Sequence, residues 1–228
     1  MECCLVFNAY EYDIQSCFPR ILLDVLEYNF PQLKHFLHNK PVRSRILGYI
    51  FKAYPDLYKT VKSVTDIIID DYISQLDKSN VLLRKIDGFV SKQKLINTSC
   101  SLLDIRLKYQ YSILVMYNKM YVGLTVDDTV IIKGVSNKTV GLSEWWKDCL
   151  TNIDLTYLQS KIYDYWTSKD LSLFAIPTDD KFMFILKNKD AITVSDYKSI
   201  MISEIDIEWY YSNHILPFVR CILSEYLD

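Results

Sequence analysis

The chain has 228 residues, half of them apolar, and its 26 basic and 28 acidic side chains leave a formal net charge of −2. This length and apolar content suffice for one large domain or for two to three smaller lobes with packed cores. The near-neutral balance excludes the strongly basic composition that is typical of dedicated nucleic-acid binders, so any contact with nucleic acid has to come from a local basic cluster. Basic residues do gather between positions 84 and 108.

The N-terminal residues MECCLVFNAYEYD carry no basic flank, and no uncharged apolar stretch of 18 residues occurs. The sequence therefore predicts neither a signal peptide nor a membrane span. We expect an intracellular protein that is not secreted, located in the cytoplasm or in the cytoplasm or nucleoid of a host cell. The cysteines form no Cys-x-x-Cys pair, which favours reduced thiols over disulfides or a zinc site. They are Cys3, Cys4, Cys17, Cys100, Cys149 and Cys221.

The first half of the chain begins with a predicted strand and continues with predicted helices. Residues 5–14 are rich in Val, Phe, Tyr and Ile, which predicts a strand that runs into Asp13. Pro19 is placed in the first turn of a helix that continues to about residue 30. The apolar spacing from 31 to 98 predicts a mostly helical segment, and helix is expected to continue through 99–118.

The second half mixes strands and helices. Residues 119–134 predict a β-hairpin with its turn near Asp127 and Asp128. A helix is predicted over 143–166, and two short strands over 171–177 and 181–187 are separated by the turn TDD. A helix over 210–227 closes the chain.

Asp13 and Asp128 both lie at the ends or turns of apolar strands. Phosphoryl transfer with two divalent cations, about 3.5–4 Å apart, uses carboxylates held on neighbouring rigid strands. Asp13 and Asp128 meet this need if the strand at 5–14 pairs with the hairpin. Buried caps and turn residues produce similar pairs of aspartates, so a purely structural role stays open at this point.

The segment YDIQSCFPRI, residues 12–21, resembles the first motif of the family B (alpha-like) DNA polymerases, which reads Asp-x-x-Ser-x-Tyr-Pro-x-Ile. The Asp, the Ser, an aromatic residue, the Pro and the Ile all fall in register. The resemblance implies that Asp13 holds catalytic metal ions and that the turn with Ser16 and Cys17 binds the triphosphate of a nucleotide. It also implies that Phe18 lies against the sugar and selects dNTPs. Backbone N–H groups in a turn before a helix suit a triphosphate.

The second motif of that family, Lys-x-x-x-Asn-Ser-x-Tyr-Gly on a fingers helix, is matched in part by KQKLINTSCS, residues 92–101. Asn97 falls in register, whereas Gln93 stands where the lysine belongs. The resemblance implies a nucleotide-binding role for Asn97 and for Lys92 or Lys94, since a flexible lysine can reach from an adjacent turn. Arg84 is expected near the same triphosphate. An ordinary amphipathic helix is the alternative for this segment.

The segment TVDDTVII, residues 125–132, resembles the third motif, Asp-Thr-Asp-Ser in a hairpin. Asp128 and Thr129 take the places of the second Asp and of the Ser, and Val126 takes that of the first Asp. The resemblance implies that Asp128 is catalytic and holds metal together with Asp13, with Asp127 as a further metal ligand and Thr129 near the DNA. The adjacent aspartates are also similar to the Tyr-x-Asp-Asp hairpin of reverse transcriptases, which we rank second because their Gln-Gly loop is absent.

The segment EIDIEWYYSNHILPFVRCIL, residues 204–223, resembles the thumb pattern of the family. Tyr210, Tyr211 and Arg220 recur at the family's spacing, which implies that they contact the primer–template duplex. Lys169 is the candidate for the basic element that follows the third motif.

Together these motifs imply a right-hand polymerase core of the α+β class, with a small antiparallel palm sheet, helical fingers and a small thumb. The palm is expected at 1–30 and 99–168, the fingers at 31–98 and the thumb at 169–228. The implied activity is template-directed addition of dNTPs to a primer 3′ end with two Mg²⁺ ions, which Mn²⁺ can replace. So small a core suggests a viral or mobile-element origin.

The implied partners are primer–template DNA, dNTPs and other replication subunits, which would supply exonuclease or processivity because only twelve residues precede Asp13. No membrane partner is expected. The alternative is a catalytically inactive, polymerase-like subunit with a structural or DNA-binding role, and Val126 and Gln93 are the residues that favour it.

Overall fold

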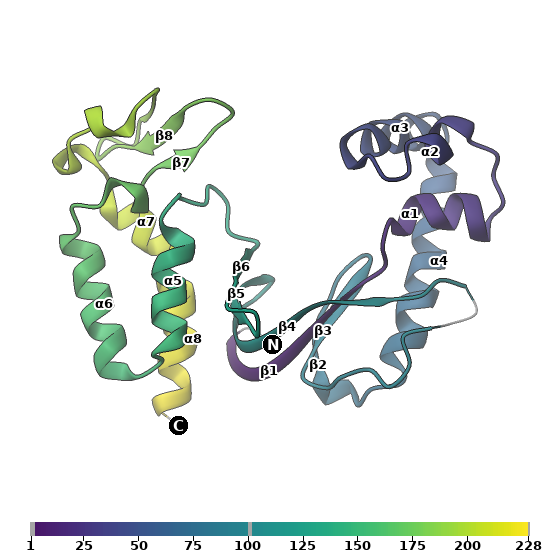
Figure 1. Ribbon diagram of the computed structural model, residues 1–228, viewed down its shortest axis with the longest axis horizontal. Coiled ribbons are helices and arrows are strands. Elements are labelled where there is room, and N and C mark those ends of the chain that lie inside the picture. The colour runs from purple at the N-terminus through teal and green to yellow at the C-terminus, as the bar shows by residue number, and fades with distance from the viewer. Residues whose placement is uncertain (1–2, 100–101, 228) are drawn as a thin grey trace. The chain divides into compact units, whose positions relative to one another are not determined.

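The computed structural model describes residues 3–99 and 102–227 of the chain (Figure 1). The chain divides into two compact units: the first unit consists of Met1–Asn8 and Tyr111–Asp228, and the second unit of Ala9–Gln110. The boundaries fall inside strands β1 (Cys3–Asp13) and β4 (Arg106–Tyr117), so both strands contribute residues to each unit. Hydrogen bonds join six strands in the order β2-β3-β1-β4-β5-β6, and a separate sheet has the order β7-β8-β9.

Helices make up much of the second unit. After β1 come the short α1 (Cys17–Arg20), a π-helical turn (Ile21–Val25) and α2 (Pro31–His35). Asn39 then caps α3 (Lys40–Ala53) by accepting a hydrogen bond from the Val42 N–H. Helix α4 (Pro55–Ile73) begins with a proline and contacts both α1 and α3. The predicted helices between 31 and 76 are therefore confirmed.

One face of α4 supplies the core of the second unit. Its buried residues lie at helical spacing, at positions 61, 65, 68, 69 and 72. The hydroxyl of Tyr72 lies 2.8 Å from the Leu103 carbonyl oxygen and 3.0 Å from that of Thr98, which share its one proton, and it accepts a hydrogen bond from the Ile105 N–H. These bonds connect the segment that precedes β4 to α4. They also supply the hydrogen-bond partners that a buried hydroxyl needs.

The prediction of helix over 82–98 is wrong. Residues 81–91 form a hairpin of β2 (Val81–Arg84) and β3 (Gly88–Ser91), and β3 pairs antiparallel with β1 so that Asp13 lies opposite Gly88. The Lys85 N–H donates to the Gly88 carbonyl and closes the hairpin turn. A Cβ on Gly88 would lie 2.0 Å from the Tyr12 carbonyl oxygen, so only glycine allows this close approach of the two strands.

The prediction of helix over 99–118 is wrong as well. Residues Arg106–Tyr117 form strand β4, which pairs antiparallel with β5 (Met120–Thr125), and β5 pairs with β6 (Val130–Lys133). Segment 106–117 contains three tyrosines together with Ile and Val, residues that pack well on a pleated surface. The predicted hairpin around Asp127 and Asp128 is confirmed, with β4 as its additional partner.

Two helices and a second small sheet complete the middle of the first unit. Helix α5 (Leu142–Thr151) packs on β5 and β6 and contacts α6 (Leu155–Thr167), which runs beside it in Figure 1. The small sheet consists of β7 (Ile176–Pro177), β8 (Phe182–Ile185) and β9 (Ala191–Val194), linked to its surroundings by 3₁₀ turns at Leu171–Leu173, Tyr197–Ser199 and Ile202–Glu204.

The predicted closing helix is present as two pieces. Helix α7 (Ile207–His214) ends just before Pro217, and α8 (Leu216–Leu227) follows. This break has a simple cause, since a proline inside a helix removes one backbone hydrogen bond. The core of the unit lies between α5 and α8, where the fully buried Trp146 meets Phe218 edge to face at 5.5 Å between ring centroids.

The expectation of reduced cysteines holds only in part. Cys3 and Cys221 form a disulfide between β1 and α8, which corrects the prediction that no disulfide is present. Cys17 and Cys149 are free and buried, as expected, Cys4 is buried and takes no part in this disulfide, and Cys100 lies outside the described residues. The two cysteines of the disulfide are 218 positions apart, so local spacing holds no sign of their pairing.

Helices and antiparallel strands are thus both present, as the α+β class requires. The right-hand arrangement and the division into palm, fingers and thumb stay predictions. Within the described residues, no helix has the length and apolar character needed to cross a membrane.

The close approach of Gly88 to the Tyr12 backbone predicts that a larger residue at position 88 lowers the stability of the fold. Gly88→Ala is expected to lower the free energy of unfolding by about 3 kcal/mol, because the new methyl group meets backbone that cannot move aside cheaply. Gly48→Ala, in the exposed middle of α3, is the matched control: its Cβ meets nothing within 4 Å, and it should stabilise by up to about 1 kcal/mol. Urea unfolding measures both, and equal stability of the two variants would contradict the packing argument.

The burial of His214 predicts how the free energy of unfolding depends on pH. Burial lowers the pKa of His214 to about 4, although its Nε2 contacts the Ser136 carbonyl at 3.2 Å. The unfolded chain takes up this proton near pH 6.5 and the folded chain only near pH 4, so stability falls as pH drops between these values. The loss should reach about 3 kcal/mol. His214→Gln should flatten the profile in urea unfolding, whereas His35→Gln, at an exposed position, should leave it unchanged.

Candidate functional site

A cavity of about 610 Å³ lies within the second unit, around the end of β1. Residues of the first-motif segment form one wall, and basic residues of α3 and β4 form the others. Its lining consists of Asp13, Ile14, Gln15, Ser16, Cys17, Phe18, Pro19, Lys40, Arg43, Ser44, Leu47, Ile86, Asp87, Arg106 and Lys108. The segment that resembles the first motif therefore lines an open cavity within the second unit.

Asp13 is held at this cavity by two basic side chains of β4. Its carboxylate, 15% exposed, lies 3.4 Å from Arg106 Nη2 and 3.4 Å from Lys108 Nζ. Arg106 and Lys108 are two positions apart on one strand, so both side chains reach the same side of the sheet. The charge of Asp13 is thus balanced within the second unit itself.

A second carboxylate accompanies Asp13. Asp87 ends the turn before Gly88, lines the same cavity, and its carbonyl accepts a hydrogen bond from the Ile14 N–H at 2.8 Å. Burial, and to a smaller extent the charge of Asp13, raises the pKa of Asp87. Asp87 is not among the residues predicted from the sequence, because the apolar spacing around it predicts a helix.

The turn after Asp13 is fixed by Arg43 of α3. Ser16 adopts the left-handed conformation, with φ 53° and ψ 42°, which is uncommon for a residue other than glycine or asparagine. Arg43 Nη1 donates to Ser16 Oγ at 2.7 Å and to the Leu37 carbonyl at 2.6 Å. Strained residues of this kind persist where the surroundings determine them, and they cluster at functional sites.

Cys17 and Phe18 lie between the cavity and the core. The Cys17 thiol is 3.8 Å from Thr65 Oγ1 of α4, and burial raises its pKa to about 12, so it stays protonated at neutral pH. The Phe18 ring meets Phe51 and Tyr58 edge to face, with centroids 5.9 and 6.0 Å away. These contacts fix the ring against α3 and α4.

The second-motif residues lie elsewhere in the second unit. Arg84 forms ion pairs with Asp66 at 3.0 Å and Asp70 at 3.2 Å on α4. Asn97 accepts a hydrogen bond from the Ser99 N–H. None of Arg84, Lys92, Lys94 and Asn97 lines the cavity around Asp13. The basic residues there are instead Lys40, Arg43, Arg106 and Lys108.

Two signals in the sequence pointed to these basic residues. Asn39 followed by Lys40 and Pro41 is an N-cap and first turn, which places Lys40 and Arg43 at the beginning of a helix. Arg106 and Lys108 belong to the basic cluster at 84–108. Because a helix was predicted over 99–118, their position on one face of a strand was not predicted.

Asp128 belongs to the first unit. It lies in the turn between β5 and β6 with φ 63°, is 66% exposed, and contacts Lys147 Nζ of α5 at 2.8 Å through Oδ2. This contact raises the pKa of Lys147. Asp127 and Thr129 are exposed on either side, and the Thr129 N–H donates to Thr125 Oγ1. Among residues 3–99 and 102–227, no group of three or more His, Cys, Asp or Glu side chains gathers as a metal site.

A third feature, also in the first unit, surrounds Lys169. Lys169, Lys187 and Lys189 line a cavity of about 590 Å³ together with Trp166. Lys189 is paired with Asp206, whose carboxylate also caps α7 by accepting from the Trp209 N–H. Lysines beside an exposed aromatic ring are the elements of many single-strand nucleic-acid sites.

The predicted thumb residues differ in exposure. Tyr210 is fully buried, and its hydroxyl accepts a hydrogen bond from the Ile185 N–H at 2.9 Å. Burial raises the pKa of Tyr210 to about 12, so in this unit the side chain packs the core. The Tyr211 ring lies 5.2 Å from that of Trp166, and Arg220 is exposed on α8.

Comparison with known proteins gives structural similarity alone, and it is weak. No family model matches the chain, and no curated protein matches it. A solved structure of the family B DNA polymerase from the hyperthermophilic archaeon Pyrobaculum calidifontis is similar over 96% of this chain, with a TM-score of 0.45 and 12% sequence identity. The chain spans 45% of the length of that polymerase.

Proposed function

We propose that this chain is a polymerase-like core that binds a deoxynucleoside triphosphate at the Asp13 cavity and adds it to the 3′ end of a DNA primer. The observation that carries the proposal is the cavity itself. It brings the first-motif residues Asp13, Ser16 and Phe18 together with four basic side chains.

The balance of charge favours an anionic ligand. Lys40, Arg43, Arg106 and Lys108 face two carboxylates, Asp13 and Asp87, so the lining carries an excess of positive charge. Arginine and lysine are the side chains that bind phosphate oxygens best, the former through paired N–H donors and the latter as a point charge. A nucleoside triphosphate fits this lining better than a neutral ligand does.

The aromatic side of the cavity fits the nucleoside. Phe18 is fixed by Phe51 and Tyr58 and still lines the cavity. A ring held in this way can exclude a sugar that carries a 2′-hydroxyl, because it cannot turn aside without losing its own packing. Selection of dNTPs over NTPs therefore belongs to the proposal.

The carboxylates of Asp13 and Asp128 suit Mg²⁺, which prefers hard oxygen ligands and is bound by one or two carboxylates together with the phosphates of the substrate. Asp13 in the second unit, and Asp128 with Asp127 beside it in the first unit, are each proposed as Mg²⁺ ligands. When bound, the ions would neutralise the charge that develops on the transferred phosphoryl group. Arg106, Lys108 and Lys147 balance these carboxylates in the structure and would have to give way to the ions or to the phosphates.

DNA binding and further subunits complete the proposal. The lysines around Trp166 supply a cationic surface for a nucleic-acid backbone, with Tyr211 beside it. Primer–template DNA is therefore the proposed macromolecular ligand, and Arg220 and Thr129 are exposed and available to it. Replication subunits that supply exonuclease or processivity remain proposed partners.

A catalytically silent subunit is the second candidate. Val126 is 54% exposed at the position where the family carries its first third-motif aspartate. Both remaining carboxylates of the proposed metal pair have cationic partners in the structure. A subunit that binds nucleotide or DNA without turnover would keep the cavity and lose the metal chemistry.

The placement of Arg43 predicts its effect on nucleotide affinity. Arg43→Gln is expected to weaken the binding of dTTP and Mg²⁺ about tenfold, since a charged hydrogen-bond donor at the cavity is lost. Arg84→Gln is the matched control and should leave affinity unchanged, because Arg84 is held by Asp66 and Asp70. Isothermal titration calorimetry measures both, and a larger loss in Arg84→Gln would restore the second-motif assignment.

Primer extension tests the metal assignment. With Mg²⁺ or Mn²⁺, a labelled primer–template and dNTPs, Asp13→Asn and Asp128→Asn should each lower the extension rate by at least about 100-fold, because each removes a negative ligand charge. Asp71→Asn, exposed on α4, should extend normally. Extension that survives either of the first two changes would overturn the two-metal assignment. Binding of dTTP and DNA by the unaltered chain without extension would establish the silent subunit.

A further inference from the structure

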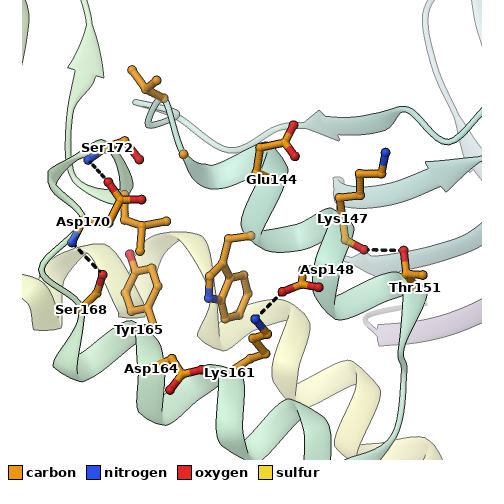
Figure 2. Close-up of a pocket in the computed structure, with 14 residues that line it drawn as sticks. Glu144, Lys147, Asp148, Thr151, Lys161, Asp164, Tyr165, Ser168, Asp170 and Ser172 are labelled. Carbon is orange, nitrogen blue, oxygen red and sulfur yellow. Dashed lines mark hydrogen bonds and ion pairs between the residues drawn. The ribbon is translucent and has the colours of Figure 1, made fainter.

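A second cavity, of about 660 Å³, lies within the first unit and is not used by the proposed polymerase chemistry. Figure 2 shows Glu144, Lys147 and Asp148 reaching it from α5, and Lys161, Asp164 and Tyr165 from α6. The segment with Asp170 and Ser172 closes a third side. We call it the α5–α6 cavity.

The charged groups of the α5–α6 cavity leave an excess of negative charge. Asp148 is paired with Lys161 and accepts a hydrogen bond from the Tyr157 hydroxyl at 2.8 Å, and Lys147 is paired with Asp128. Both lysines are therefore engaged. Glu144 and Asp164 are exposed, and over the described ranges 3–99 and 102–227 the structure gives them no ion pair. Asp170 lines the same cavity, is exposed and likewise has no ion pair among the described residues, so the cavity presents three carboxylates without a cationic partner to a ligand.

Two buried polar groups at the same cavity have no hydrogen-bond partner among the described residues. They are the hydroxyl of Tyr165, whose side chain is fully buried, and the indole N–H of Trp145, which is 8% exposed. In Figure 2 the Tyr165 ring rises from α6 toward the segment that carries Asp170. Buried polar groups are nearly always hydrogen-bonded, so two unpaired donors beside one cavity point to a missing acceptor.

These two sets of groups together define the chemistry of the ligand. The indole N–H can only donate, so the ligand has to offer an acceptor, while the carboxylates require a cation. A bare metal ion or a polyamine supplies the positive charge without the acceptor. A peptide segment supplies both, through its backbone carbonyls and through lysine or arginine side chains.

We propose that the α5–α6 cavity seats a basic peptide segment of a partner protein, with its cationic side chains on Glu144 and Asp164 and its backbone carbonyls at Trp145 and Tyr165. This proposal is independent of catalysis at Asp13, because the α5–α6 cavity is formed entirely by the first unit.

The test is a binding titration with defined probes. A fluorophore-labelled Lys-Arg-Lys-Arg peptide, acetylated and amidated at its ends, is titrated with the full chain in about 0.1 M salt and followed by anisotropy. The double change Glu144→Gln and Asp164→Asn should weaken binding about tenfold, and Tyr165→Phe about threefold. Glu208→Gln, an exposed carboxylate of the same unit outside the cavity, should bind as the unaltered chain does. Far-UV circular dichroism confirms that each variant folds.

Several outcomes would overturn the proposal. One is the absence of binding by the unaltered chain at millimolar concentration. Another is an equal loss in Glu208→Gln, which would show general attraction of charge. Displacement of the peptide by spermidine at equal cation concentration would show that no acceptor is needed. If Tyr165→Phe bound the peptide with unchanged affinity, the peptide would not accept a hydrogen bond from the Tyr165 hydroxyl, and water would be the partner of that hydroxyl.

Discussion

The contact between Gly88 and the backbone of Tyr12 determines where the functional side chains of the second unit lie. Because glycine has no Cβ, β3 can approach β1 closely, and Asp13 is set opposite Gly88 at the last position of the pairing. The turn before Gly88 then brings the Asp87 carbonyl to the Ile14 N–H, which ends the strand and directs the chain into the Ser16 turn. One backbone approach thus positions Asp13, Asp87 and the first-motif turn together.

Charge compensation maintains this arrangement. A partly buried carboxylate such as Asp13 is stable only with a partner, and Arg106 and Lys108 provide it from a strand that is distant in sequence. In the same unit the buried Glu11 is paired with Lys85 of the hairpin turn at 2.6 Å. The β2–β3 hairpin is therefore attached to β1 by a buried ion pair as well as by the backbone hydrogen bonds between β3 and β1. The basic side chains around the cavity stabilise the fold and also create the field that favours a phosphate ligand.

Local patterns in the sequence predicted the strand at Asp13, the helices from 31 to 76, the hairpin at Asp128 and the helices of the first unit. The same patterns gave wrong predictions for residues 82–98 and 99–118, where helix was predicted from apolar spacing alone. Asp87-Gly88 is a typical hairpin turn, and the alternation of Arg106 and Lys108 is that of a strand, but both lie in segments whose leucines and isoleucines also suit a helix. The cation partners of Asp13 could not be predicted, since their approach depends on the pairing of segments that lie far apart in the chain.

The proposed nucleotide binding and the proposed turnover draw on different parts of this molecule. The cavity that carries the first motif, its basic side chains and its aromatic wall is contained in residues 9–110, whereas Asp128 and Val126 belong to the first unit. Loss of a carboxylate in the β5–β6 turn therefore leaves the chemistry of the nucleotide cavity untouched. This separation explains how a chain can keep a well-formed first motif while its third motif changes. Under the proposed function, nucleotide affinity alone would therefore test the second unit, and only a reaction that requires Asp128 would test both units.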